Sequence, residues 1–180
     1  MMGAIIGDIV GSRFEGSGFQ KKDFELFTER CRATDDSIMT LAVAKAIMET
    51  VKTIEPPAVS TSSDEEFHRL LSKNTVQCMQ RIGRKYPNAG YGGRFGGWLF
   101  TPNAQPYNSF GNGAAMRISP AGLAARSEQE AARLSETITA VTHDHEEGMK
   151  GGEATAVAVY MANTGFSKDE IREKITKNYY

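Results

Sequence analysis

The sequence has few cysteines, and this excludes two kinds of small protein. Only Cys31 and Cys78 occur among its 180 residues, which is too few for a disulfide framework. Neither has a neighbouring cysteine or histidine at the spacing of a zinc finger. We expect both thiols to be reduced, as they are in cytosolic proteins.

Long apolar runs and a strong charge of one sign are also missing. No apolar stretch approaches the roughly 18 residues that a membrane helix needs. The opening MMGAIIGDIVGS differs from a signal peptide because it lacks a basic region and Asp8 interrupts its apolar run. The formal net charge of -1 gives no overall basic field for nucleic acid. We expect a cytoplasmic protein with neither a membrane nor a nucleic acid as its partner; the oligomeric state stays open.

Alternating strand patterns are absent, whereas helical periodicity is frequent. The opening GAIIGDIVGS fits a helix or a short strand, and residues 53–63 fit a surface loop. Four segments carry apolar or small residues at helical spacing: Ile38, Leu41, Ala42, Lys45 and Met48; Phe67, Leu70, Leu71, Cys78 and Ile82; Ala131, Ser135, Ile138 and Val141; Ala154, Val157, Ala158 and Met161. The length suits one domain. The sequence therefore predicts a compact all-α fold, with residues 1–180 forming a single domain.

Capping boxes mark three helix starts. In each, a serine hydroxyl can accept from a backbone N–H three residues later, and the glutamate there can accept from the serine N–H. The pairs are Ser63 with Glu66, Ser127 with Glu130, and Ser167 with Glu170. The last of these predicts a final helix with only Ile171 and Ile175 as apolar positions, so we expect that helix to be poorly covered.

Thr34, Asp35 and Asp36 begin the helix that runs through Met48. Hydroxyl and carboxylate oxygens in sequence are hard ligands suited to Mg²⁺ or Mn²⁺. The same residues also suit a helix cap, because threonine and aspartate accept from the free N–H groups and acids favour the helix dipole. From these residues alone the cap is the favoured interpretation.

Two acidic residues lie in the glycine-rich opening. Glu15 follows Gly11 in a stretch able to move as a flap, where a carboxylate could orient a substrate hydroxyl or activate water; a solvated surface glutamate is the simpler alternative. Asp8 lies inside an apolar run and needs a hydrogen-bond partner if it is buried. A structural role and a chemical role are equally compatible with Asp8.

Two later glycine-rich loops fit a diphosphate, because glycine lets backbone N–H groups approach phosphate oxygens. One is NAGYGGRFGGW and the other SFGNGAAMRISP; neither matches a Walker A loop or a dinucleotide fingerprint. Ordinary turn glycines are the simpler explanation for either loop alone. Phe95, Trp98 and Phe110 are either core aromatics or stacking partners for an adenine or a ribose.

Two histidines stand two residues apart in Thr142-His143-Asp144-His145. This spacing argues against zinc, because residues i and i+2 of a helix point to different faces. A cap formed by Thr142 or Asp144, with one histidine lining a pocket, fits better.

The order and spacing of five segments are more specific than any segment alone. GAIIGDIVGSRFE, ATDDSIMT, AGYGGRFGGW, SFGNGAAMRISP and THDHEEGMKGGEA together resemble the ADP-ribosylglycohydrolase family, to about residue 160. The family includes the dinitrogenase reductase-activating glycohydrolase. The resemblance implies an all-α fold and a Mg²⁺-dependent hydrolase that cleaves ADP-ribose from a protein side chain or a small molecule.

The resemblance also implies roles for individual residues. Metal binding would fall to Thr34, Asp35 and Asp36, and catalysis to Glu15 with Asp35 and Asp36. Ligand binding would fall to Gly90, Tyr91, Gly92, Ser109, Phe110, Gly111, Asn112, Gly113 and His143. The cofactor would be Mg²⁺ or Mn²⁺, and the partner an ADP-ribosylated protein or an ADP-ribose-containing small molecule.

This sequence departs from the family pattern in one respect. Members usually supply a second metal motif, Asp-x-Asp followed by Ser or Thr, and none follows Glu153. We expect either a fragment or a naturally short relative. An inactive ADP-ribose-binding or structural relative is therefore the alternative to an active hydrolase.

Overall fold

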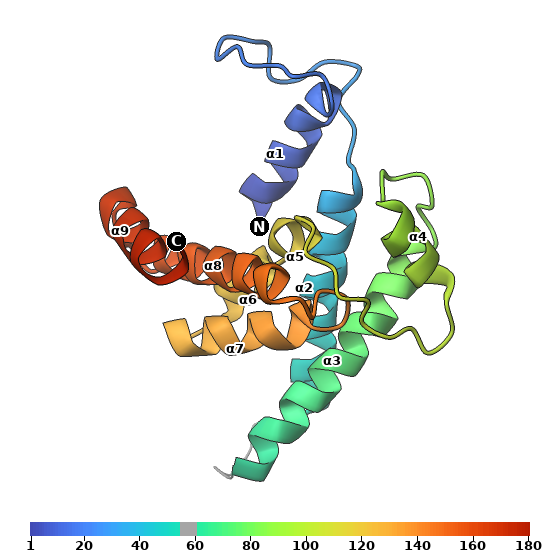
Figure 1. Ribbon diagram of the computed structural model, residues 1–180, viewed down its shortest axis with the longest axis vertical. Helices are drawn as coiled ribbons and strands as arrows, with labels where there is room; N and C mark the ends of the chain where they lie inside the picture. The colour runs from blue at the N-terminus through green and yellow to red at the C-terminus, as the bar shows by residue number, and fades with distance from the viewer. Residues whose placement is uncertain (55–60) are drawn as a thin grey trace.

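The computed structural model describes residues 1–54 and 61–180, which form helices joined by turns and loops (Figure 1). These ranges contain no strand, so the predicted all-α class is confirmed. Within them no helix is long and apolar enough to cross a membrane. The helices are α1 (Met2–Gly11), the short 3₁₀ helix η1 (Ser12–Phe14), α2 (Asp35–Thr53), α3 (Thr61–Gly83), α4 (Gly93–Phe100), α5 (Gly113–Arg117), α6 (Ser119–Ala124), α7 (Glu128–Thr139), α8 (Glu146–Asn163) and α9 (Lys168–Tyr179).

Helix α2 lies at the centre of the bundle and packs on α3, α5 and α6 (Figure 1). Its buried face carries several small residues, which let the neighbouring helices approach closely. That face consists of Met39, Thr40, Ala42, Val43, Ala46, Ile47 and Thr50. Leu71 and Met79 of α3 join the same two clusters of core side chains.

The predicted helix over this segment is confirmed, but the predicted face is wrong at three positions. Leu41 and Met48 are 45% and 53% exposed, and Lys45 is exposed as well. Two overlapping stripes of this helix are apolar, so periodicity indicates a helix without showing which stripe is buried. Contact with α3, α5 and α6 determines which of the two stripes is buried. Ala42 belongs to both stripes.

Helices α7 and α8 pack closely through small residues. The four predicted positions of α7 and its end, from Ala131 to Val141, are buried. A Cβ atom at Gly152 of α8 would lie 2.6 Å from the Thr139 hydroxyl and 3.2 Å from that of Ser135. Val157 and Met161 are buried as predicted, and Ile171 of α9 packs against their cluster. None of the residues of α9 is buried, as its sparse apolar pattern predicts.

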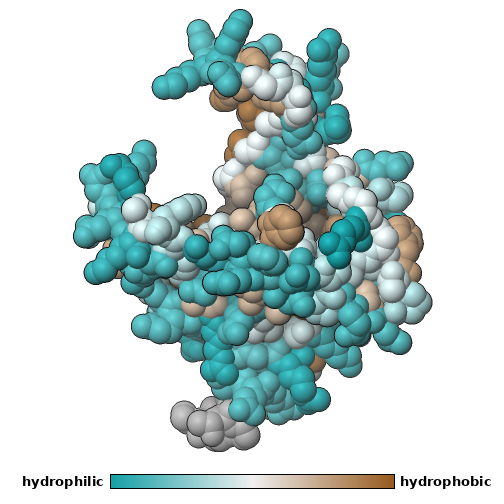
Figure 2. Space-filling model, in the orientation of Figure 1, coloured by the Kyte–Doolittle hydropathy of each residue, from teal (hydrophilic) through white to brown (hydrophobic). Residues whose placement is uncertain are grey.

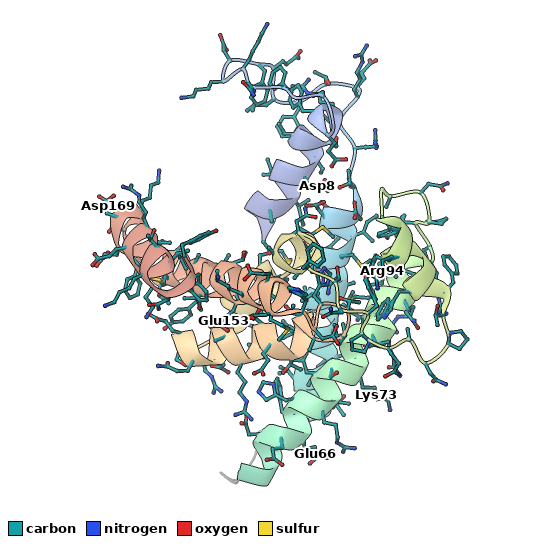
Figure 3. All side chains as sticks on the ribbon, viewed as in Figure 1. Asp8, Glu66, Lys73, Arg94, Glu153 and Asp169 are labelled. Carbon is teal, nitrogen blue, oxygen red and sulfur yellow. The ribbon has the colours of Figure 1, made fainter. Side chains whose placement is uncertain are left out.

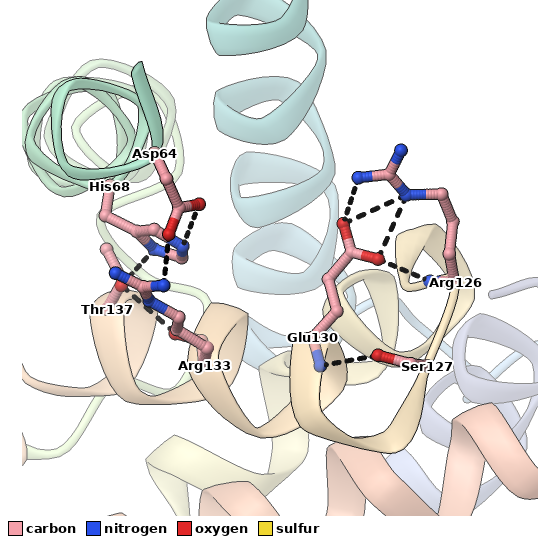
Figure 4. Close-up of polar contacts among 7 residues, drawn as sticks. All are labelled: Asp64, His68, Arg126, Ser127, Glu130, Arg133 and Thr137. Atoms are coloured by element: carbon pink, nitrogen blue, oxygen red, sulfur yellow. Dashed lines mark hydrogen bonds and ion pairs between the residues drawn. The ribbon is translucent and has the colours of Figure 1, made fainter. Parts of the chain in front are cut away.

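The serine caps are confirmed to different extents. Ser167 and Glu170 make both bonds of a capping box. Ser127 accepts from the Glu130 N–H, but the Glu130 carboxylate accepts from the backbone and guanidinium of Arg126 instead of the Ser127 N–H (Figure 4). The Ser63 side chain lies outside the described residues, but α3 begins at Thr61, before the start predicted at Ser63. Of the loop predicted over 53–63, residues 55–60 lie outside the described residues, whereas Thr53 belongs to α2 and residues 61–63 belong to α3.

The opening segment is a helix and not a strand. Helix α1 buries only Val10 and projects from the bundle beside the start of α2 (Figure 1). Much of its surface is apolar or glycine, seen as brown, tan and white in Figure 2. A polar side chain, Asp8, ties α1 to α2.

Helix α6 approaches α8 so closely that Gly122 should not tolerate a side chain. A Cβ atom there would lie 2.3 Å from the Ala156 carbonyl oxygen and 3.0 Å from the Tyr160 nitrogen. We expect Gly122→Ala to lower the free energy of unfolding in urea by about 2–3 kcal/mol, because backbone atoms must move apart. Gly151→Ala is the control: no atom lies within 4 Å of its Cβ position, and it should gain about 0.5–1 kcal/mol in a helix. Equal effects of the two substitutions would contradict this account of the packing.

Candidate active site

Asp8 of α1 holds the N-terminus of α2 (Figure 3). Its Oδ2 accepts from the backbone N–H groups of Thr34 and Ser37, at 2.9 and 3.1 Å. Its Oδ1 accepts from the Thr34 hydroxyl at 2.5 Å. The Thr34 oxygen in turn accepts from the Asp36 N–H at 3.4 Å, which makes Thr34 the N-cap. Asp8 therefore has the structural role that its sequence position left open, because it satisfies N–H groups that a helix start leaves free.

Three carboxylates converge beside this helix start. Asp8, Glu15 and Asp36 each offer an oxygen within 4.8 Å of the others. Burial and the charge of Asp8 raise the pKa of Asp36. Burial and the charges of Asp36, Glu15 and Asp8 raise the pKa of Asp35 to about 6. Carboxylates that repel one another in this way suit a divalent cation, which would neutralise them through hard oxygen ligands.

An aromatic cluster orders the loop that carries Glu15. The rings of Phe14 and Phe19 stack with centroids 3.9 Å apart, and Phe24 meets both edge-on. The Arg13 guanidinium lies 4.5 Å from the Phe14 ring centre and donates to the Thr28 hydroxyl at 2.9 Å. The Glu15 side chain itself is exposed.

A cavity of about 300 Å³ opens next to Asp35. It is lined by Asp35, Gly92, Gly93, Arg94, Phe95, Tyr107, Ser109, Gly111, Asn112, Gly113, Met116, Arg117 and His143. Gly90 lies at its border with a φ of +109°, and a Cβ atom there would be 3.1 Å from Asp35 Oδ1. Only glycine suits this position, because the conformation and the close approach both disfavour a side chain.

The loop 109–113 is held against the start of α8. A Cβ atom at Gly148 would lie 2.6 Å from the Ser109 carbonyl oxygen, so glycine permits this contact. The Asp144 carboxylate accepts from the Asn108 N–H at 2.6 Å. A Cβ atom at Gly113 would lie 3.3 Å from the His143 ring. The loop and the histidine therefore form one wall of the cavity.

His143 is buried and electrically neutral near pH 7. Burial and the Arg117 charge lower its pKa to about 4. The Thr142 oxygen accepts from Arg117 Nη2 at 2.6 Å and lies 2.8 Å from His143 Nδ1. This contact holds the imidazole in place, and the neutral ring keeps one donor and one acceptor nitrogen. The prediction that one histidine lines a pocket agrees with this position.

The predicted cap in this segment is wrong. His145, and neither Thr142 nor Asp144, is the N-cap of α8, because its Nδ1 accepts from the Glu147 N–H at 3.1 Å. The Thr142 hydroxyl instead accepts from the Arg117 guanidinium, and the Asp144 carboxylate accepts from the Asn108 N–H.

Some predicted site residues lie apart from the cavity. Phe110 is 70% exposed and contacts His145, with ring centroids 5.1 Å apart. Trp98 is a core aromatic, and Phe95 is both core and cavity wall. Tyr91 packs against the same cluster with its hydroxyl buried, and burial raises its pKa to about 12.

Sequence reasoning missed Arg94, Tyr107, Met116 and Arg117, which all line the cavity. Arg94 lies on α4 (Figure 3), where its guanidinium donates to the Tyr107 carbonyl at 2.6 Å and lies 4.9 Å from the centre of the Tyr107 ring. Arg117 ends α5 and is fully buried. Its signal in the sequence was a charge inside the run AAMRIS, the same signal that drew attention to Asp8.

Comparison with known proteins agrees with the resemblance. A family model described as ADP-ribosylglycohydrolase matches residues 1–179. A protein named ADP-ribosylhydrolase ARH3 from Xenopus tropicalis is 27% identical over 184 residues, covering 92% of this chain and 49% of that protein. The protein of the same name from Danio rerio is 25% identical over 186 residues, covering 92% and 47%. The chain thus spans about half the length of the curated relatives it matches.

The neutral state of His143 should make stability depend on pH. The imidazole titrates near 6.5 when unfolded and near 4 when folded, so the unfolded state takes up the proton first as the pH falls. We expect the wild type to lose about 2 kcal/mol more unfolding free energy than His143→Gln between pH 7 and pH 5. Urea unfolding of both proteins at the two pH values measures this. Equal losses would show that His143 is not held in its neutral form.

Proposed function

The chain belongs to the ADP-ribosylglycohydrolase family, and from this premise we propose that it hydrolyses the bond between ADP-ribose and an acceptor. The acceptor is a protein side chain or a small molecule, and the cofactor is Mg²⁺ or Mn²⁺. One observation carries the proposal: consecutive residues of α2 face both halves of the site. Asp35 lines the cavity, while Asp36 belongs to the carboxylate cluster.

The oxygen-rich start of α2 suits the cofactor. Thr34, Asp35 and Asp36 would hold the ion, with Glu15 completing the acidic surroundings. Asp8 accepts a hydrogen bond from the Thr34 hydroxyl. The Thr34 oxygen accepts one bond from the Asp36 N–H, which leaves one lone pair of that hydroxyl for a metal. A bound Mg²⁺ would supply positive charge that orients ribose hydroxyls and a water molecule, and Mn²⁺ accepts the same kind of ligands.

The glycine-rich walls suit the rest of the ligand. The loop 109–113 would bind the diphosphate through backbone N–H groups, since these approach phosphate oxygens where side chains are small. Gly90, Tyr91 and Gly92 would border the ribose beside Asp35. His143 would line the wall as an uncharged ring. Binding energy gathered here would position the sugar for reaction at its anomeric carbon.

Glu15 is our proposed proton-transfer group. It lies on the loop after η1, beside Asp8 and Asp36, and its exposure leaves it accessible to water. A carboxylate in this position can accept a proton from the attacking water as the bond to the acceptor breaks. The negative charges of Asp35 and Asp36 would also favour the positive charge that develops on the ribose ring.

Binding of ADP-ribose without turnover is a second candidate. It is favoured by one observation: in the described carboxylate cluster of Asp8, Glu15 and Asp36, the Asp8 oxygens already accept three hydrogen bonds. Such a cluster would hold a metal less tightly than three unoccupied carboxylates.

Calorimetric titration with ADP-ribose tests the site. We expect binding that weakens at least tenfold when EDTA replaces Mg²⁺, and a similar loss in Asp35→Asn with Asp36→Asn. The matched control is Glu65→Gln with Glu66→Gln, two consecutive exposed carboxylates on α3; Glu66 lies at the far end of the molecule from Asp8 (Figure 3). The control should bind as the wild type does. If none of these proteins binds ADP-ribose, the proposal is contradicted.

A second measurement, the release of ADP-ribose from a modified protein, then distinguishes an enzyme from a protein that only binds the ligand.

Asp35 should limit stability when no metal is added. Its pKa near 6 lies above the ordinary 3.8, so the folded state binds the proton more tightly and loses stability as the pH rises through 6. We expect Asp35→Asn to stabilise the metal-free protein by about 1–2 kcal/mol at pH 7.5, which is a rise of a few degrees in Tm. Added Mg²⁺ should raise the Tm of the wild type and not of the variant. A lower Tm for the metal-free variant would show that Asp35 stabilises the fold instead.

A further inference from the structure

Arg117 is a charged residue buried where its charge has no obvious partner. It is 1% exposed and lines the cavity from the end of α5. Its Nη2 donates to the Thr142 hydroxyl at 2.6 Å, and its Cζ lies 5.7 Å from the centre of the Phe95 ring. Its Nε is buried and has no hydrogen-bond partner within residues 1–54 and 61–180. Among the residues that the structure describes, no carboxylate lies within ion-pair distance of it.

A buried guanidinium without an ion pair lowers the stability of the fold unless a ligand supplies the negative charge. Burial lowers the pKa of Arg117 to about 10, which still leaves the guanidinium charged at neutral pH. A buried charge without a counterion loses its hydration and gains no ion pair in return. A hydroxyl and an aromatic face replace only part of that hydration.

The neighbours of Arg117 do not supply the missing negative charge. His143 is neutral, because burial and the Arg117 charge itself lower its pKa. Asp35 lines the same cavity, but the two side chains form no ion pair. The guanidinium therefore lines a cavity that it shares with Asp35 and with the loop 109–113.

We propose that Arg117 binds the anionic part of the ligand, a diphosphate held jointly by this guanidinium and the backbone of residues 109–113. This inference rests on the function proposed above and assigns the diphosphate end of the ligand to one side chain. A diphosphate oxygen accepts from the guanidinium where it lines the cavity and provides a counterion that the described residues do not supply. Arginine suits this task because its planar fork matches phosphate oxygens.

Methionine at position 117 distinguishes ligand binding from structural support. It keeps an unbranched stem in the same space and removes the buried charge, a change that is often neutral or stabilising. We expect Arg117→Met to keep or raise the Tm of the metal-free protein and to bind ADP at least tenfold more weakly. Adenosine, which has no phosphate, should bind both proteins equally. These titrations are made in EDTA, so that they do not depend on the metal site.

Two further variants serve as controls. Arg81→Met removes the same charge from an exposed residue of α3 that pairs with Glu49, and its ADP affinity should equal that of the wild type. Arg117→Lys keeps the charge without the fork, and it should bind ADP with an affinity between those of the wild type and the methionine variant. If Arg117→Met does not fold, the lysine variant decides, because a purely structural role leaves the ratio of ADP to adenosine affinity unchanged.

The outcomes separate this inference from the proposed function. Undiminished ADP affinity in Arg117→Met, or in Arg117→Lys if only that variant folds, overturns the role of Arg117 while leaving the site intact. A wild type that binds neither ADP nor ADP-ribose overturns both. A selective loss of ADP binding with an unchanged or higher Tm supports the assignment, because a structural arginine would show the opposite pattern.

Discussion

The carboxylate of Asp8 is the contact on which the site depends. Helix α1 buries only Val10, so apolar packing alone holds it weakly against the bundle. The three hydrogen bonds from Thr34 and Ser37 to Asp8 fix α1 at the start of α2. Each bond to a charged acceptor is worth about 1.5–3 kcal/mol. Since only η1 separates Glu15 from α1, the same contact sets where that carboxylate lies relative to Asp36.

Charge is separated along the site. Carboxylates gather at the N-terminus of α2, whereas the buried guanidinium of Arg117, at the end of α5, lines the cavity together with the loop 109–113. A ligand with a polyol at one end and a diphosphate at the other meets both needs: the polyol suits a cation held by the carboxylates, and the diphosphate suits the guanidinium. Neither end is electrostatically satisfied by the described protein groups alone. This separation of charge explains why the protein has ionisable groups that lower the stability of the ligand-free fold.

Local signals in the sequence were sufficient for the helices but not for their contacts. The capping box at Ser167 is confirmed because all its atoms lie within four residues. The buried face of α2 was mispredicted, since two of its stripes are apolar and helices distant in the sequence choose between them. The Glu130 carboxylate likewise accepts from Arg126, a competitor that the box pattern does not include. The family resemblance indicated which loops matter, but their geometry comes from close approaches such as Gly148 to Ser109.

Asp8 and Arg117 show why a charge within an apolar run is informative and yet ambiguous. Both break such a run, and in both cases the apolar residues beside them in the sequence favour burial. Asp8 finds three donors in its own chain, so its charge becomes part of the fold. Arg117 finds one hydroxyl, one ring and no described carboxylate. The sequence signal is the same, and the number of internal partners separates the two residues. The half-buried charge of Asp8 is saturated and stabilises the architecture, whereas the buried charge of Arg117 lines a cavity and is available to a ligand of opposite charge.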